Sequence, residues 1–390
     1  MTKPAVSATP SDADLTKGME HLRPYVSVAQ SKSNAVQIAP GDRDEEDVYG
    51  VPATSINPLR RPTVERVEQS SNPQKRVDPF TFGSRVLTSE DDIFEFNAWD
   101  NVEVDEAFAS FAELQYAAQR ENPVSDFDKS KYNATPEKWW DRFYKNNTSN
   151  FFKDRKWLFQ EFPVLTEAIA EDSPPVRILE IGAGAGNTAF PILKDNKNPA
   201  LRIHACDYAP SAVNVMRSSP AYDDKYIQAD VWDVAGVSED GGVSLPPDVG
   251  CGTVDIVILI FIFSALAPSQ WTQALQNIDA VLKPGGQILF RDYGRGDLAQ
   301  VRLKKGRYLD ENFYIRGDGT RVYFFEKEEL ESLFGLGNQA ATAEDPAENL
   351  AERPRFQIRN LAVDRRMLIN RKRKLKMYRT WMQGHFVKAI

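Results

Sequence analysis

Cysteine and histidine are scarce in this chain, which has two of the former and three of the latter among 390 residues. Neither Cys206 nor Cys251 belongs to a CxxC motif or a Cys/His cluster. We therefore expect neither a disulfide framework nor a structural zinc site, and no other metal. A reducing compartment suits such a sequence.

Long apolar runs are also missing. The most apolar run, Val254–Leu266, is too short to cross a bilayer, which takes roughly 20 apolar residues, and is typical of a buried parallel strand. The first forty residues contain no continuous apolar segment and carry the acids Asp12, Asp14 and Glu20, which argues against a secretory signal and a transit peptide. We expect no membrane contact and a cytoplasmic location.

The chain as a whole has no excess of positive charge, since its net charge is −8. The tail from Glu352 to Ile390 nevertheless has twelve basic and two acidic residues and carries +10, which leaves −18 on the remainder. Because the positive charge is confined to one segment, it indicates an anionic partner for that segment despite the acidic total.

Composition divides the chain into three parts. Residues 1–78 are rich in Pro, Ser, Ala and acidic residues without an apolar period, which predicts a disordered leader. Residues 79–135 form an N-terminal region in which dense aromatic residues precede a helical pattern. The main domain covers residues 136–390 and includes an acidic, Ala-rich flexible loop at 335–352 and a basic pair of strands at 353–390.

Strands alternate with helical segments through the main domain, as in a doubly wound α/β fold. We expect a Rossmann-like, mostly parallel sheet of seven strands, with the helical N-terminal region as an extension. The predicted strands are Arg177–Ile181, Leu201–Cys206, Tyr226–Ala229, Asp255–Phe261, Gln287–Arg291, Phe356–Asn370 and Met377–Lys388.

A glycine-rich turn follows the first of these strands. The segment Val176–Thr188 reads VRILEIGAGAGNT, with glycines at 182, 184 and 186. Glycines allow positive φ and close approach of a ligand, and the helix that follows offers unpaired N–H groups. Dinucleotide-binding proteins space their glycines as G-x-G-x-x-G, and Asn187 occupies the position of the third one. The spacing of Gly182, Gly184 and Gly186 favours a class I S-adenosylmethionine-dependent methyltransferase over a dehydrogenase.

Acidic residues at the ends of neighbouring strands extend this site. Asp207 lies 21 residues beyond the last glycine, close to the spacing of about 20 at which an acid binds ribose hydroxyls. Asp230 could bind the adenine amino group, with Val231 and Ile260 flanking the ring. The alternative is that both acids only cap helices.

Four further segments carry a family resemblance. They read WWDRFYKNNTSNFFKDRKWLFQEFP (139–163), LIFIFSAL (259–266), FRDYGRGD (290–297) and ENFYIRGDGTRVYFF (311–325). In these segments, and over about residues 80–388, the chain resembles the eukaryotic tRNA 3-methylcytidine methyltransferases, which modify cytidine 32 of the anticodon loop. The segment 82–108 and the C-terminal end look most like the subgroup that acts on threonine tRNA.

The resemblance implies S-adenosylmethionine as cofactor and the tRNA anticodon arm as partner, and it leaves open a synthetase or another protein as a further partner. In this family the aromatic segment before the sheet folds over the cofactor, which implies contacts from Trp140 and Tyr144. By position it also implies an acid, Glu180, near the methionine end. The alternative for Trp140 and Tyr144 is packing of a helix against the sheet, a role that Trp139 and Phe143 could share.

Methylation of cytosine N3 formally requires no general base, because N3 has a free lone pair at neutral pH. The product ring is cationic, so a nearby carboxylate would stabilise the developing charge. Asp292 is our catalytic candidate, because it follows a strand at the sheet edge where α/β folds bind ligands. The alternative is an ion pair with Arg291 or another arginine. The target base must leave its stack, and the aromatic side chains available to receive it are Phe261, Phe263 and Tyr293.

Basic residues supply the candidate RNA surface. In the usual methyltransferase topology the turn between the last two strands lies on the same sheet edge as the cofactor, which would place its charges where they can neutralise phosphates. The alternatives are a solvated face or a localisation signal. The candidates are Arg371, Lys372, Arg373, Lys374 and Lys376 in that turn, with Lys153, Arg155, Arg316 and Arg321 elsewhere.

Two other functions stay open on the sequence alone. One is a class I methyltransferase that acts on protein or on another RNA position, and the other is a tRNA-binding subunit that has lost catalysis. Intact Glu180, Asp207, Asp230 and the three glycines argue against the second.

Overall fold

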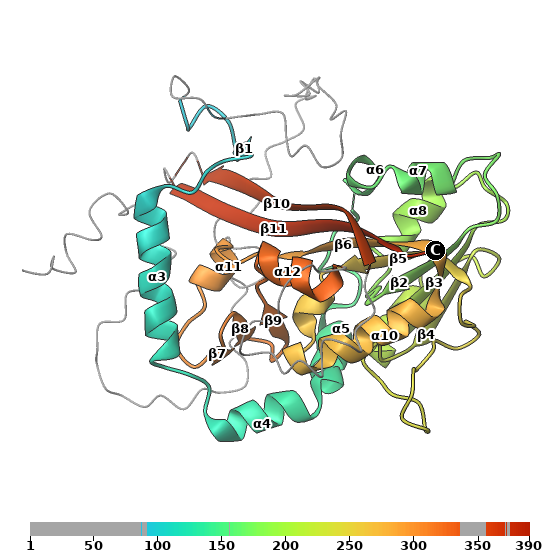
Figure 1. Cartoon of the computed structure of the whole chain (residues 1–390). Helices are drawn as coiled ribbons and strands as arrows, with labels where there is room; N and C mark the ends of the chain where they lie inside the picture. Colours follow the sequence, from blue (N-terminus) through green and yellow to red (C-terminus); the bar gives the residue numbers. More distant parts are fainter. Residues whose placement is uncertain (1–86, 88–91, 156, 336–355, 371, 373–374) are drawn as a thin grey trace, which may run out of the picture.

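The computed structural model of the chain describes residues 87, 92–155, 157–335, 356–370, 372 and 375–390. The predicted leader, and the predicted loop apart from its first residue, lie outside the described residues. Within them the chain forms a central sheet with helices on both faces (Figure 1). This confirms the predicted α/β class.

The central sheet has eight strands in the order β1-β10-β11-β6-β5-β2-β3-β4. The strands β6, β5, β2, β3 and β4 run parallel, and β11 lies antiparallel between β6 and β10. All seven predicted strands are present: Arg177–Ile181 (β2), Arg202–Asp207 (β3), Ile227–Val231 (β4), Val254–Ile260 (β5), Leu282–Tyr293 (β6), Phe356–Asn370 (β10) and Leu375–Lys388 (β11). The predicted count of seven is corrected to eight by β1 (Ala98–Asp100), whose three residues are too few to show an alternating pattern.

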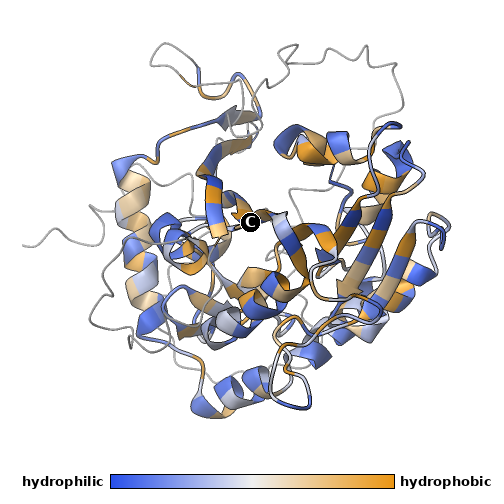
Figure 2. Ribbon diagram, turned by 45° about the vertical axis from the view of Figure 1, so that its right-hand side comes forward, coloured by the Kyte–Doolittle hydropathy of each residue, from blue (hydrophilic) through white to orange (hydrophobic). Residues whose placement is uncertain are grey.

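Two layers of helices sandwich the sheet, and residues along each central strand alternate between them. In β5, Val257 and Leu259 face one core while Ile256 and Ile258 face the other. Burial on both faces explains the unbroken apolar run in the sequence, and Figure 2 shows the hydrophobic residues gathered on the central strands. The first layer contains α10 (Trp271–Val281) and α12 (Lys327–Phe334), and the second α6 (Leu158–Glu161), α7 (Val164–Ala168), α8 (Ala189–Asp195) and α9 (Pro210–Arg217).

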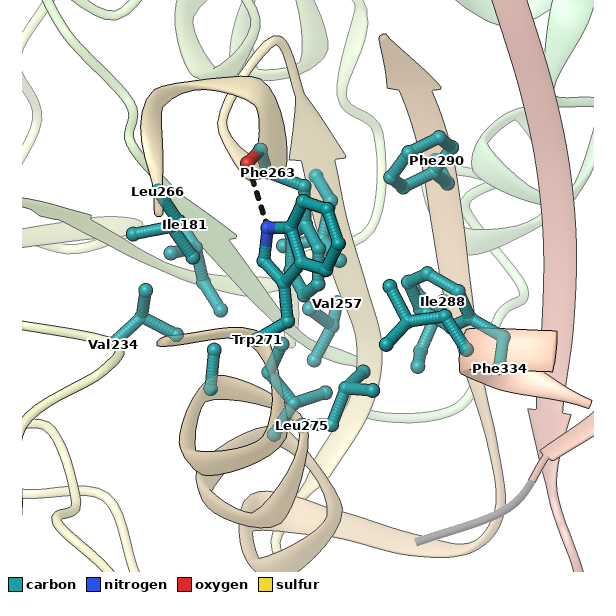
Figure 3. Close-up of a cluster of buried hydrophobic side chains, with 14 of the residues drawn as sticks. Ile181, Val234, Val257, Phe263, Leu266, Trp271, Leu275, Ile288, Phe290 and Phe334 are labelled. Atoms are coloured by element: carbon teal, nitrogen blue, oxygen red, sulfur yellow. Dashed lines mark hydrogen bonds between the residues drawn. The ribbon is translucent and has the colours of Figure 1, made fainter. Parts of the chain in front are cut away.

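Trp271 of α10 connects the first layer to the chain that follows β5. Its indole N–H donates a hydrogen bond to the carbonyl of Phe263 at 3.2 Å, in a cluster that includes Leu266 and Phe290 (Figure 3). The bond holds two short 3-10 turns, η3 (Phe263–Ala265) and η4 (Pro268–Gln270). This segment forms one wall of the site described below.

The N-terminal region packs on the far end of the C-terminal hairpin. Its helix α3 (Glu106–Arg120) begins at Asp105, whose carboxylate accepts the Phe108 N–H at 2.8 Å. The apolar face of α3 shares a core with Trp99 of β1 and with Met367 and Tyr378 of the hairpin. The region is therefore joined to the main domain through the sheet itself and through this core.

The β10–β11 hairpin extends well past the sheet. The last pair between β11 and β6 is Trp381 with Tyr293, whereas β10 and β11 stay paired as far as Asn370 with Leu375. The overhang of six residues measures about 20 Å at roughly 3.3 Å per residue. Because β10 runs in the same direction as β6, the strand ends Asn370 and Leu375 lie beyond the carboxyl ends of the parallel strands, the edge at which we predicted the basic turn.

Two helices and a small sheet complete the structure. The chain between the N-terminal region and the main domain forms α4 (Asp126–Ala134) and α5 (Pro136–Asn147). The three-stranded sheet consists of β7 (Tyr308–Asp310), β8 (Phe313–Ile315) and β9 (Arg321–Tyr323), and it follows α11 (Leu298–Val301). Among the described helices, none has the length and apolarity needed to span a membrane.

Candidate active site

A pocket opens at the carboxyl ends of β2, β3 and β5. Its lining combines the glycine turn after β2, the chain after β3 and β4, the wall after β5, helix α5 and the segment after α5. Of the predicted cofactor residues it includes Trp140, Tyr144, Glu180, Gly182, Gly184, Asp207 and Ile260. The structure thus brings together residues that span more than 100 positions in the sequence.

Gly184 allows the pocket to close. Its φ is 60°, and a Cβ at this position would lie 2.3 Å from the hydroxyl oxygen of Tyr144. Only glycine fits both the left-handed backbone and the approach of this tyrosine. Gly186, with φ of 85°, faces the Phe190 ring and is not part of the pocket lining.

The Asp207 carboxylate fixes the glycine turn through hydrogen bonds to the backbone. One carboxylate oxygen accepts the Gly184 N–H at 2.8 Å and the other accepts the Ala209 N–H at 2.9 Å. Burial raises the pKa of this carboxyl to about 6, although the two backbone donors oppose the shift. The arrangement fixes the carboxylate at the pocket wall, where its remaining lone pairs can accept hydrogen bonds from a ligand.

Glu180 is buried in the pocket wall, and its Oε2 has no hydrogen-bond partner among the described residues. Burial raises the pKa of Glu180 to about 7, opposed by the hydroxyl of Thr188 and by the charge of Arg155. A buried carboxylate with an open oxygen costs free energy unless a donor or a cation meets it. The pocket is therefore suited to a ligand with a positively charged group.

Helix α5 covers the pocket with aromatic rings. Trp140 and Tyr144 lie in the lining. Phe143 lies on the same face of the helix and packs against Phe151 and Phe152, with ring centroids 4.5 and 5.7 Å apart. Trp140 and Tyr144 belong to the same cluster, so both interpretations of these two residues hold: they pack the helix against the fold and also face the pocket, whereas Phe143 only packs.

Asp230 and Val231 do not line this pocket. The Asp230 carboxylate binds Arg217 at 2.7 Å and the Gln228 amide at 2.8 Å and lies 3.0 Å from Nε2 of His204, and Val231 is 47% exposed. The chain after β4 instead contributes Trp232, Asp233 and Val234 to the lining. The sequence ADVWD (229–233) contains a second acid, Asp233. It was the only indication in the sequence that the lining begins after Val231.

Asp292 is fully buried and outside the pocket lining. Its carboxylate accepts the N–H groups of Ser264 at 2.9 Å and Tyr293 at 2.8 Å, and burial raises its pKa to about 6. The alternative of an ion pair with Arg291 is wrong, because Arg291 binds Asp364, whereas the charge of another arginine, Arg316, does lower the pKa of Asp292. In this structure Asp292 holds the wall after β5 and does not line the pocket.

An aromatic and cationic stack continues from the pocket mouth. The Arg155 guanidinium lies 5.3 Å from the Phe261 ring, whose centroid is 4.8 Å from that of Tyr293, and Arg316 lies 5.4 Å from the Tyr293 ring. Phe261 has a φ of 59°, which is rare for a bulky residue and concentrates at functional sites. The stack places two cations around two aromatic faces beside the pocket.

The other basic candidates occupy different environments. Arg321 is buried in the pocket wall and binds the Ala265 carbonyl and Gln270, so its predicted place on an exposed RNA surface is corrected. Lys153 and Lys372 are exposed, and Lys376 lies 4.0 Å from Asp105. The remaining candidates, Arg371, Arg373 and Lys374, lie outside the described residues. Within the described chain, no cluster of three or more His, Cys, Asp or Glu could hold a metal.

Comparison with known proteins shows which proteins this chain is similar to. A family model described as a methyltransferase domain matches residues 179–288. The tRNA(Thr) (cytosine(32)-N(3))-methyltransferase of Saccharomyces cerevisiae is 49% identical over 330 residues, which cover 85% of this chain and 49% of that protein. The chain therefore spans about half the length of this relative.

Other relatives match along nearly their whole length. The Schizosaccharomyces pombe tRNA N(3)-methylcytidine methyltransferase trm140 is 47% identical, over 79% of this chain and 92% of that protein. The human tRNA N(3)-cytidine methyltransferase METTL2B is 34% identical, over 79% and 94%. Among solved structures, the N-methyltransferase NodS from Bradyrhizobium japonicum matches 65% of this chain and 98% of its own at 14% identity, with a TM-score of 0.37. A similarity at this TM-score adds nothing to the fold already described.

Proposed function

Because the chain belongs to the tRNA N(3)-methylcytidine methyltransferase family, we propose that it transfers a methyl group from S-adenosylmethionine to N3 of cytidine 32 in the anticodon loop of threonine tRNA. The observation that carries the proposal is the open carboxylate oxygen of Glu180, buried at a glycine turn that Tyr144 covers. A positively charged cofactor supplies the charge and the hydrogen-bond donor that this oxygen lacks.

The pocket residues fit the cofactor by chemical type. S-adenosylmethionine supplies an electrophilic methyl group on a sulfonium. Glu180 accepts from the positively charged methionine end, and Asp207 accepts from the ribose hydroxyls at the next strand end. Trp140 and Tyr144 exclude water above the turn, and Ile260 lies against the adenine together with Trp232. Gly182 and Gly184 leave room for Ile262 and Tyr144 to close against the turn, and Gly186 completes the turn.

The stack at the pocket mouth receives the target base. Phe261 or Tyr293 offers an aromatic face for a cytosine turned out of the loop, and the guanidinium groups of Arg155 and Arg316 are placed to bind the flanking phosphates. N3 needs no base to become nucleophilic, so these residues act by holding it in line with the methyl group. Asp292 contributes by holding the N–H of Ser264 and thus the wall from which Phe261 projects.

The overhanging hairpin binds the anticodon arm. Its turn lies beyond the carboxyl ends of the strands, on the same side as the pocket, and Lys372 is exposed there. Arg371, Arg373, Lys374 and Lys376 add charge to the same turn by their position in the sequence, and Lys153 adds charge beside the pocket. The cytoplasmic location expected from the sequence, and a synthetase or another protein as partner, belong to the proposal as well.

Labelled methyl transfer tests the proposal. The protein should transfer label from S-adenosylmethionine to threonine tRNA and fail with the same tRNA carrying uridine at position 32, which has no free N3 lone pair at neutral pH. Transfer to both tRNAs equally would mean that another position is the target. Label in protein rather than in RNA would mean a different substrate class.

A further inference from the structure

The hairpin formed by β8 and β9 touches both sides of the cofactor pocket, although it lies outside the segment matched by the methyltransferase domain. Its closing turn spans residues 316–320. The Arg316 N–H donates to the Thr320 carbonyl at 2.8 Å, and the Gly319 N–H donates to the Arg316 carbonyl at 3.0 Å. The turn therefore has a fixed shape rather than an open loop.

Gly319 lies against the indole of Trp139. It has a φ of 88°, and a Cβ there would lie 2.2 Å from ring carbon Cε3 of Trp139. The ring also packs on Tyr132 of α4, with centroids 5.1 Å apart, and Lys131 lies 5.7 Å from the ring. The indole thus contacts both the turn and α4.

Arg321, the first residue of β9, attaches the same hairpin to the opposite wall. Its guanidinium donates to the Ala265 carbonyl at 3.1 Å and to the Gln270 side chain at 2.8 Å, and it reaches the Asn133 side chain of α4 at 3.4 Å. Ala265 and Gln270 line the pocket, as does Arg321 itself. The β8–β9 hairpin therefore contacts both helix α5, which covers the pocket, and the wall after β5.

We infer that Gly319 is a positioning residue for the cofactor: the absence of a side chain lets the turn seat against Trp139 and so sets the position of α5. Trp139 is followed directly by Trp140, and Tyr144 lies on the same helix, so a displaced indole shifts the residues that cover the pocket. Because the indole is rigid, a new Cβ at Gly319 can be accommodated only if the whole Trp139 side chain or the turn moves. The inference rests on the cofactor assignment of the proposed function but not on the RNA substrate.

The test compares two glycine variants by calorimetry with S-adenosylmethionine and no tRNA. Gly306 is the matched control: its φ is 73°, it lies in a turn of the same region, and a Cβ there meets nothing within 4 Å. Gly306→Ala and Gly319→Ala share the strain of alanine at positive φ. Only Gly319→Ala should weaken cofactor binding, by about tenfold or more, because it removes a preorganised cover. Equal dissociation constants for the two variants would overturn the inference.

A second pair of variants keeps the test decisive if Gly319→Ala does not fold. Trp139→Ala removes the same contact without backbone strain, and it should raise the KM for S-adenosylmethionine while leaving kcat at saturating cofactor close to wild type. Adding Trp139→Ala to Gly319→Ala should then cost no further affinity, since both changes break one contact. Unchanged cofactor affinity in Trp139→Ala would overturn the inference. If the wild-type protein itself fails to bind S-adenosylmethionine, the proposed function fails instead.

Discussion

The carboxyl group of Glu180 is buried in the pocket, and burial raises its pKa to about 7. A carboxyl whose pKa is raised by folding stabilises the ligand-free protein below the unfolded pKa and loses that contribution as the pH rises through about 7. A cation beside the ionised carboxylate reverses the penalty. Cofactor binding should therefore tighten, not weaken, as the carboxyl ionises.

We predict that the affinity for S-adenosylmethionine rises between about pH 6 and 8 and that binding releases protons below about pH 7, because the ligand favours the ionised form of Glu180. Calorimetry in buffers of different ionisation enthalpy measures both. Glu180→Gln should bind more weakly and lose most of the pH dependence. Asp207, whose pKa is about 6, stays in that variant and accounts for any slope that remains. An identical pH profile in Glu180→Gln would contradict the assignment.

At the scale of elements, the overhang of the β10–β11 hairpin packs on the N-terminal region. Met367 and Ile369 of β10 and Met377 and Tyr378 of β11 lie in the core shared with α3, and the two strands stay paired as far as Asn370 and Leu375. In the proposed function, the basic residues between these strand ends bind phosphates. Phosphate contacts release counterions, so the salt dependence of tRNA binding reports on them.

We predict that alanine at Arg371, Arg373 and Lys374 weakens tRNA binding and lowers the slope of log K against log salt by about 2 units, at roughly 0.7 to 0.9 per phosphate contact. The matched control removes three exposed lysines, Lys194, Lys197 and Lys225, that precede β3 and β4 at the opposite edge of the sheet. The control should leave the slope unchanged. Filter-binding titrations at several salt concentrations measure it, and equal slopes for both triple variants would show that net charge alone matters.

For the whole molecule, the central strand β5 could be read from the sequence because it is buried on both faces and forms an apolar run, whereas the edge strand β4 alternates buried and exposed residues. β1 and β7 could not be predicted, since three residues carry no period. The glycine turn and Asp207 were predictable because strand ends in such a sheet meet at one edge. The direction in which a carboxylate side chain points at that edge could not be predicted.

Asp230 and Asp292 illustrate that limit. Both follow or end a strand at the predicted edge, yet Asp230 faces His204 and Arg217, and Asp292 faces the backbone of Ser264. Those partners lie 13 to 28 positions away in sequence, and nothing in the local pattern indicates them. Arg321 is a similar case, since its burial depends on the η3–η4 wall, which is distant in the chain.

The central claim is that cytidine 32 of threonine tRNA is methylated at N3, and nucleoside mass spectrometry of tRNA incubated with the protein and isotopically labelled S-adenosylmethionine tests it most directly. The account predicts labelled 3-methylcytidine, located at position 32 by fragment mapping and absent with Glu180→Gln under limiting cofactor. Labelled tRNA that contains a different methylated nucleoside, or no 3-methylcytidine with any threonine tRNA, alone or with a synthetase added, would contradict it.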